Sequence, residues 1–374
     1  MRIAFVGQKG IPAVSGGIEK YVEDLASRVA LAGHEAIVYT RPHYTAANAR
    51  SYRNIRLISL PSYKTKHLDA ISHTALACVD VMFRKVDVIH FQAIGPALLI
   101  WLPKIFCPQA KIVATLQSRD YEHKKWGAFA RLSLHVGEWL MCRCADEVIV
   151  VSKSMQAYVQ TKYQIDADYI ANGANFHLAK NPANLIRAWG LCKDNYVVTV
   201  SRLVRHKGLN RLVDAWKLIK TDKKLVIVGG GAFTDDYVSE LYALAQTDER
   251  ILFLGEQSGQ ALDELYDNAY LFVQPSESEG LSLSLLEAMA RGKAVLVSSI
   301  VENKEAIGEA GFVFPVDDTP ELKNKLTNLL QQPDLIERAG RLAHQRARQY
   351  YDWDELAQKN YGALRQAQDT APAD

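Results

Sequence analysis

The sequence predicts an α/β protein with two doubly wound halves, each a parallel sheet with helices on both faces. Short apolar segments alternate with amphipathic segments, and this alternation restarts near the middle of the chain. The chain has 374 residues, enough for two domains at about 100–200 residues per domain. Two such halves enclose a cleft, and ligands bind beyond the carboxyl ends of the strands. The strand-end loops are therefore where chemistry is expected.

In the first half, residues 2–7 predict the first strand and residues 17–31 a helix. Val22, Leu25 and Val29 recur every three or four positions in that helix, as one buried face requires. Short β-branched and apolar segments predict the later strands. These strands are expected at residues 35–40, 55–60, 87–92, 111–116 and 147–152.

In the second half the pattern begins again at residues 195–203, followed by a helix over 209–218. Domain boundaries are predicted near the IANGAN segment, giving an N-terminal domain 1–172 and a C-terminal domain 173–350. A terminal helix over about 351–367 is expected to pack back onto the first domain. Further strands are expected at 224–231, 251–255, 270–276 and 294–299.

Composition favours an ordinary globular protein, with 48% hydrophobic and 23% charged residues. No apolar run reaches membrane-spanning length, and the opening MRIAFVGQKG lacks the features of a signal peptide. The five cysteines form no CxxC pair, which favours reduced thiols over disulfides or structural zinc. The expected location is the cytoplasm, with a peripheral position on the inner face of the plasma membrane as a further expectation.

Charge is unevenly distributed along the chain. Residues 1–172 hold 21 Lys/Arg against 14 Asp/Glu, whereas the remainder holds 23 against 28. Basic side chains mix with apolar ones over residues 126–141, and residues 97–106 are strongly apolar. This pattern suits contact with an anionic membrane, although core packing also explains most of these apolar residues. No nucleic-acid-binding motif is present, so no nucleic-acid partner is expected.

The most informative segment is ESEGLSLSLLEAMARGKAV, which places Glu279 and Glu287 around a helix start with seven residues between them. Ser282 or Ser284 can cap the helix. The backbone N–H groups of Gly280, Leu281 and Ser282 would then lie between two carboxylates, at a helix end that attracts anions. A ligand with both phosphate and hydroxyl groups, such as a nucleotide-sugar, suits this arrangement. An acid-rich helix start without a ligand is the plainer alternative.

The loop SRLVRHKG follows an apolar strand and carries Arg202 and Lys207. A forked guanidinium contact and an ammonium point charge suit a diphosphate that leaves with extra negative charge. A solvated basic loop is the alternative reading.

Three other strand-end loops carry candidate contacts. Gly16 and Gly17 let backbone approach a ligand at the next helix start, although the GxGxxG spacing of a dinucleotide site is absent. His90 and Gln117 end two strands of the first half, and Asp120 could meet an acceptor hydroxyl. His90 could equally be a structural residue, and Asp120 could pair with neighbouring basic side chains.

Together these motifs resemble the retaining glycosyltransferases of the GT-B fold, family 4, over nearly the whole chain. The resemblance rests on the E-x7-E pattern of Glu279 and Glu287, the loop SRLVRHKG and the IANGAN turn. The opening GQKGIPAVSGGIEKYVEDLA is similar to a bacterial subset often assigned as rhamnosyltransferases or other polysaccharide-assembly enzymes.

The resemblance implies that Arg202 and Lys207 bind the donor diphosphate, that Glu287 binds ribose and that Glu279 holds the donor sugar. Gly16 and Gly17 would face the donor from the first domain. No metal or other cofactor is implied. The expected activity is transfer of a sugar from a nucleoside-diphosphate sugar to a lipid-linked or growing glycan, as in bacterial surface polysaccharide assembly.

One departure from the family pattern is Gln117, where relatives often carry a histidine near the donor sugar. Glutamine can hydrogen-bond but does not take up a proton at neutral pH, so altered donor choice is expected. Three alternatives remain: a nucleotide-sugar epimerase of the same fold, an inactive sugar-nucleotide-binding subunit and a glycoside hydrolase. The last is disfavoured because retaining hydrolases need carboxyl groups about 5 Å apart.

Overall fold

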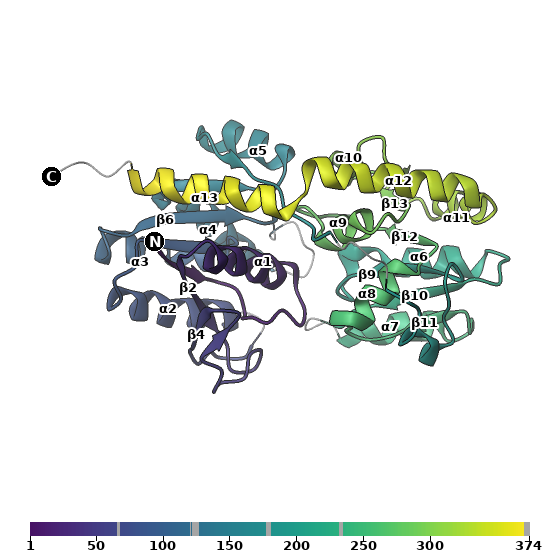
Figure 1. The fold of residues 1–374 in the computed structure, drawn as a ribbon, viewed down its shortest axis with the longest axis horizontal. Coiled ribbons are helices and arrows are strands. Elements are labelled where there is room, and N and C mark those ends of the chain that lie inside the picture. The colour runs from purple at the N-terminus through teal and green to yellow at the C-terminus, as the bar shows by residue number, and fades with distance from the viewer. Residues whose placement is uncertain (66–67, 120, 122–126, 177–180, 232–234, 370–374) are drawn as a thin grey trace. The chain divides into compact units, whose positions relative to one another are not determined.

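The computed structural model describes residues 1–374 except 66–67, 120, 122–126, 177–180, 232–234 and 370–374 (Figure 1). The chain forms two compact units, one made of Met1–Asn172 with Trp353–Asp374 and the other of Gly173–Asp352. Each unit is an α/β domain built on a parallel or mostly parallel sheet. The predicted fold class is therefore confirmed.

The first unit contains a sheet whose described strands run in the order β3-β4-β2-β1-β5-β6-β7-β8. All neighbours pair in parallel except β3 and β4. The central strands are mostly apolar and buried because helices cover both faces of a parallel sheet. The strands are β1 (Arg2–Val6), β2 (Glu35–Thr40), β3 (Ser51–Tyr52), β4 (Ile55–Ser59), β5 (Val88–Gln92), β6 (Lys111–Leu116), β7 (Glu147–Val150) and β8 (Asp168–Tyr169).

Two helical layers cover this sheet. Helix α1 (Gly17–Leu31) packs beside α13 (Trp353–Asp369), and α13 also contacts β6 and β7. The second layer consists of α2 (Asp69–Met82), η1 (Pro96–Leu99), α3 (Trp101–Phe106) and α4 (Ala128–Cys144), which pack against one another. The winding direction reverses between α1 and these helices, which places them on the opposite face. Helix α5 (Lys153–Tyr163) packs against β7 and β8.

The C-terminal helix α13 belongs to the first unit although it follows the second in sequence (Figure 1). Trp353 lies against Tyr21 of α1 with ring centroids 5.5 Å apart. The Tyr21 hydroxyl donates to Asn360 Oδ1 at 3.0 Å. The helix begins at Trp353, two residues after the predicted start, and the Tyr351 carbonyl accepts a hydrogen bond from the Ala174 N–H within the second unit.

The second unit has a parallel sheet with described strands in the order β11-β10-β9-β12-β13-β14. Strand β9 lies between β10 and β12, so the loops after these three strands meet at one edge. The strands are β9 (Tyr196–Val200), β10 (Lys224–Val228), β11 (Ile251–Phe253), β12 (Leu271–Gln274), β13 (Val295–Ser298) and β14 (Phe312–Phe314).

Helices of the second unit bury one apolar face each. In α6, Leu209, Leu212, Val213 and Trp216 point into the core at a spacing of three or four residues. The helices are η3 (Ile186–Trp189), η4 (Arg205–Lys207), α6 (Leu209–Lys217), α7 (Asp235–Ala245), α8 (Gly259–Asp267), α9 (Leu283–Ala290), α10 (Val301–Ile307), α11 (Thr319–Leu330) and α12 (Pro333–Tyr350). Within the described part of the chain, no helix is both long and apolar enough to cross a membrane.

Candidate active site

A lysine and a glutamate meet at the carboxyl edge of the second sheet. Lys207 ends η4, which follows β9, and Glu279 lies in the loop after β12. The Lys207 Nζ donates to Glu279 Oε1 at 2.5 Å. The two side chains are only 13% and 8% exposed. Because a largely buried ion pair is little screened by water, the two opposite charges interact strongly at this edge of the sheet.

The two loops that carry this pair are held together by backbone contacts. The Glu277 N–H donates to the His206 carbonyl at 2.7 Å. Gly208 has φ 66°, and a Cβ there would lie 2.1 Å from the Pro275 carbonyl oxygen. Only glycine permits this close approach, which brings the end of η4 against the loop after β12.

The same loop leads directly into helix α9. Ser282 is the N-cap, and its Oγ accepts from the Leu285 N–H at 3.4 Å. The Ser282 hydroxyl also donates to Gln274 Oε1 at 2.6 Å, and Gln274 Nε2 donates to Asn303 Oδ1 at 2.7 Å. Of the two predicted caps, Ser282 is therefore the one used. The positive end of the α9 dipole lies just after Glu279, Gly280 and Leu281.

Glu287 lies one turn inside α9 and is partly exposed. The hydroxyl of Tyr266, on α8, is buried close to it. Burial, with the Glu287 carboxylate as a second cause, raises the pKa of Tyr266 well above its ordinary value. Tyr266 therefore stays protonated and can serve only as a neutral neighbour of Glu287.

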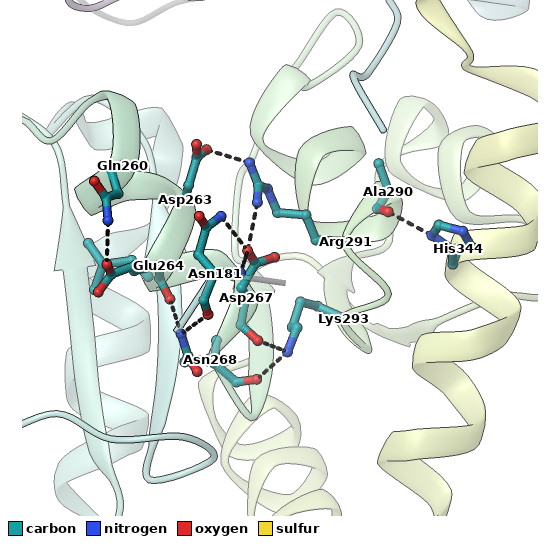
Figure 2. Close-up of polar contacts among 12 residues, drawn as sticks. Asn181, Gln260, Asp263, Glu264, Asp267, Asn268, Ala290, Arg291, Lys293 and His344 are labelled. Carbon is teal, nitrogen blue, oxygen red and sulfur yellow. Dashed lines mark hydrogen bonds and ion pairs between the residues drawn. The ribbon is translucent and has the colours of Figure 1, made fainter. Parts of the chain in front are cut away.

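A polar network ties the far end of α9 to α8 (Figure 2). Arg291 forms ion pairs with Asp263 and, at 3.0 Å, with Asp267. Its guanidinium lies over the Tyr266 ring, 5.9 Å from the centroid. Lys293 Nζ donates to the backbone carbonyls of Asp267 and Ala269 at 2.6 and 3.0 Å. This network holds in place the helix that carries Glu287.

Sequence reasoning missed these supporting residues. The signal was the sequence RGK directly after an apolar helix, since Lys293 is buried and the Arg291 side chain is only 7% exposed. Buried cations of this kind require acidic or carbonyl partners. Which partners they find depends on α8, 24 to 28 residues earlier in the chain.

Arg202 follows β9 and lies beside the glycine loop at the end of β10. The Leu203 N–H donates to the Gly230 carbonyl at 2.8 Å. A Cβ at Gly229, where φ is 139°, would lie 1.9 Å from the Ser201 carbonyl oxygen. Among the described residues, the Arg202 guanidinium has no hydrogen-bond or ion-pair partner. The neighbouring Arg205 is instead paired with Glu240 at 2.5 Å.

In the first unit, Gly16 is the N-cap of α1, with φ 99°, and Gly17 is the first helical residue. The helix side chains brace the loop before them. Glu19 accepts from the Lys9 N–H at 3.0 Å, and a Cβ at Gly16 would lie 2.0 Å from Glu19 Oε2. Glu19 is therefore a supporting residue that the sequence analysis did not single out.

His90 and Gln117 lie in neighbouring strand ends of the first sheet but differ in setting. His90 is fully buried within β5, and its Nε2 lies 2.7 Å from Thr115 Oγ1. Burial lowers the pKa of His90 to about 3. Gln117 follows β6, is 8% exposed, and donates to Gln92 Oε1 at 3.3 Å. His90 thus occupies a core position, and its predicted sugar or acceptor contact remains a prediction, as does that of Gln117.

The site residues therefore fall into two groups. Within the second unit, the structure brings together Arg202, Lys207, Glu279, Gly280, Leu281, Ser282 and Glu287 at the ends of β9 and β12. Gly16, Gly17, His90 and Gln117 belong to the first unit, and Asp120 lies outside the described residues. Among described side chains, no group of three His, Cys, Asp or Glu is arranged to hold a metal. Metal independence remains a prediction.

Comparison with known proteins identifies the class. Residues 173–346 match the family model described as glycosyl transferases group 1, and residues 15–178 match the model described as glycosyltransferase family 4. The structure is similar to that of Anabaena HepE in complex with UDP-glucose, with a TM-score of 0.80 and 21% identity. That match covers 98% of this chain and 100% of the other. The fold is therefore that of the GT-B class.

Two relatives extend this result. An uncharacterized glycosyltransferase of Methanocaldococcus jannaschii is 28% identical over 80% of this chain and 81% of its own length. A Campylobacter jejuni N,N'-diacetylbacillosaminyl-diphospho-undecaprenol alpha-1,3-N-acetylgalactosaminyltransferase is 31% identical over 45% of this chain and 43% of its own length. The chain carries the two domain types of the group 1 and family 4 glycosyltransferases, and it is a glycosyltransferase of this kind.

Proposed function

We propose that this glycosyltransferase moves a sugar from a nucleoside-diphosphate sugar to an acceptor hydroxyl, with retention of anomeric configuration and without a metal. The observation that carries the proposal is the Lys207–Glu279 pair, 2.5 Å apart beside the N-terminus of α9. A cation and a helix N-terminus suit a diphosphate, and the adjacent carboxylates Glu279 and Glu287 suit sugar and ribose hydroxyls.

In the proposed step, the acceptor oxygen forms a bond to the anomeric carbon as the bond from that carbon to the diphosphate oxygen breaks. The leaving phosphate oxygen takes the proton of the acceptor hydroxyl, so charge and atoms balance. Arg202, Lys207 and the α9 N-terminus stabilise the negative charge that grows on the diphosphate. Groups preorganised for that charge lower the barrier more than they strengthen ground-state binding.

We propose a lipid-linked or growing glycan in bacterial surface polysaccharide assembly as the acceptor. The Campylobacter relative is named for a diphospho-undecaprenol acceptor, and the HepE structure contains UDP-glucose. The similarity of the opening segment to rhamnosyltransferases makes rhamnose one candidate sugar. We further propose a cytoplasmic enzyme that contacts the inner face of the membrane peripherally, where such an acceptor would lie.

A thermal-shift panel with UDP, TDP, GDP, ADP and NAD, each with and without EDTA, tests the donor and the metal. A ligand that binds the folded state raises the melting temperature. One nucleoside diphosphate should do so equally in EDTA, and the Lys207→Ala variant should lose most of that shift. No response to any diphosphate, or a response to NAD alone, would contradict the proposal.

The reaction itself is tested by incubating the protein with sugars linked to the nucleoside diphosphate that stabilises it. NMR of the product should show the anomeric configuration of the donor, and product should form only when an acceptor is present. A changed sugar released without acceptor would indicate the epimerase alternative. Nucleotide binding without any turnover would indicate an inactive subunit.

A further inference from the structure

Helix α4 of the first unit has apolar side chains on both of its faces. One face is buried in the unit and includes Leu134, Met141 and Cys142. The opposite face carries Phe129, Leu132, Val136 and Trp139, three or four residues apart, which are 84%, 62%, 41% and 49% exposed. A helix in an ordinary surface layer has polar residues on its outward face. The second apolar face of α4 therefore needs another explanation.

The neighbouring helix α3 extends this surface. It contacts α4 and exposes Trp101, Ile105 and Phe106, which are 40%, 61% and 59% exposed. We call these three side chains and the four outward ones of α4 the α3–α4 surface. Singly scattered apolar residues are normal on a protein surface, whereas contiguous apolar patches mark sites of interaction.

The charges on these helices are almost all positive. Arg131 and Arg143 are exposed on α4. The one acidic residue of α3 and α4 is Glu138, which is fully buried. Glu138 accepts hydrogen bonds from Tyr158, Lys162 and Tyr163 of α5. The exposed charges of α4 are thus cationic, and the one acidic side chain of the two helices is turned away from solvent.

We propose that the α3–α4 surface docks this protein on an anionic lipid bilayer, with the aromatic and aliphatic side chains inserted between headgroups. Trp and Phe favour the membrane interface, and arginines are attracted to anionic headgroups. A second copy of the chain fits less well, because two such faces would bring like charges together. This inference rests on the proposed function, in which the acceptor is lipid-linked, and assigns the surface that reaches it.

Vesicle flotation of the full chain tests the surface. Vesicles of phosphatidylcholine alone are compared with vesicles containing about one-third phosphatidylglycerol, at low and at high salt. The wild-type protein should float with the anionic vesicles at low salt and less at high salt. The triple variant Phe129→Ser/Leu132→Ser/Trp139→Ser should bind at least tenfold more weakly. Arg131→Glu/Arg143→Glu should lose most of the preference for anionic vesicles.

The matched control is Leu31→Ser/Leu218→Ser/Tyr350→Ser, which removes equally exposed apolar side chains elsewhere. It should float like the wild type. All variants should keep the wild-type melting temperature, because the substituted positions are exposed. Wild-type protein that ignores anionic vesicles at low salt would overturn the proposal, as would a triple variant that still binds. The proposal would also be overturned if the wild-type protein did not bind vesicles but formed a dimer, and the triple variant were a monomer.

A transfer assay separates this inference from the proposed function. The triple variant should turn over a short-chain, water-soluble acceptor at the wild-type rate and a vesicle-embedded acceptor at least tenfold more slowly. If the triple variant kept the wild-type rate on both acceptors, the docking surface would be contradicted and the transferase proposal would stand. The absence of stabilisation by any nucleoside diphosphate would contradict the transferase proposal. Vesicle flotation is measured without nucleotide and therefore tests the docking surface separately.

Discussion

Lys207 is the residue on which the proposed chemistry depends most. Its ammonium group lies at the end of a short 3-10 helix, paired with a largely buried carboxylate. Arg202, five residues earlier in the same loop, has no partner among the described residues. A paired cation and an unpartnered one have different consequences when removed. Loss of Lys207 also leaves Glu279 without its partner, whereas loss of Arg202 leaves none of the described groups unpaired.

Replacing Lys207 with alanine should therefore lower kcat by about 100-fold or more, as expected when one group that stabilises transition-state charge is lost. Gln117→Ala should cost far less, because among the described residues the Gln117 side chain hydrogen-bonds to Gln92 and carries no charge. Steady-state kinetics with the identified donor measures both. Arg202→Ala should lower kcat with little change in melting temperature. Similar losses for Lys207→Ala and Gln117→Ala would contradict this ranking.

His90 predicts a pH dependence of stability. Burial lowers its pKa to about 3, below the unfolded value of about 6.5. The unfolded chain takes up a proton as the pH falls below about 6.5 and the folded chain does not, so stability is lost in that range. At pH 5 this single group costs about 2 kcal/mol.

The His90→Gln variant should thus show a flatter decline in melting temperature between pH 7 and pH 5 than the wild type. His135→Gln, which removes an exposed histidine of α4, should follow the wild-type decline. A His90→Gln curve parallel to the wild type would show that folding does not lower the pKa of His90.

Among the secondary-structure elements, η4 and α9 define the candidate site through the loops that join them to the sheet. The sequence predicted the start of α9 closely, with Ser282 or Ser284 as cap. Gln274, at the end of β12, selects Ser282 by accepting its hydroxyl. This choice could not be predicted from the helix alone, because the partner belongs to the preceding strand. Likewise, the short helix η4 has no apolar periodicity by which it could be recognised.

Gly208 connects η4 to α6, and its replacement tests how tightly the two site loops pack. Gly208→Ala places a Cβ 2.1 Å from the Pro275 carbonyl oxygen, whereas Gly255→Ala, at nearly the same φ of 65°, meets no atom within 4 Å. In both variants the free energy of unfolding should fall by roughly 1 kcal/mol, because alanine is disfavoured in the left-handed backbone region. Only Gly208→Ala should lower the free energy of unfolding by about a further 1–3 kcal/mol, which urea unfolding measures. Only this variant should also lose the stabilisation by bound nucleotide. Equal destabilisation would show that the loop moves aside freely.

For the whole molecule, the distinctive feature is that the first unit is completed by the last helix of the chain. Trp353, Leu356 and Leu364 of α13 are almost fully buried against this unit. They follow the entire second unit in sequence. The first unit therefore needs a segment that follows the second unit in the chain.

A chain that ends at Asp352 should retain the second unit but lose stability in the first. Removing buried large side chains costs about 2–5 kcal/mol for each such residue. Differential scanning calorimetry should show one transition lowered or lost, while the other transition keeps its shift with nucleotide. A chain that ends at Asp369 serves as control and should melt like the full chain. Unchanged transitions in the shorter chain would contradict an essential role for α13.

The sequence alone determined the two α/β domains, the order of their main strands and helices and the loops in which chemistry was expected. Apolar periodicity, strand-end glycines and the Glu279/Glu287 spacing are local signals, and local signals can be read from a chain. Only the tertiary structure decided that Lys207 pairs with Glu279, that Arg291 and Lys293 brace α9 and that Phe129 and Trp139 face outward. These outcomes depend on which distant segments become neighbours, and a pairing across 72 residues is set by the packing of the sheet.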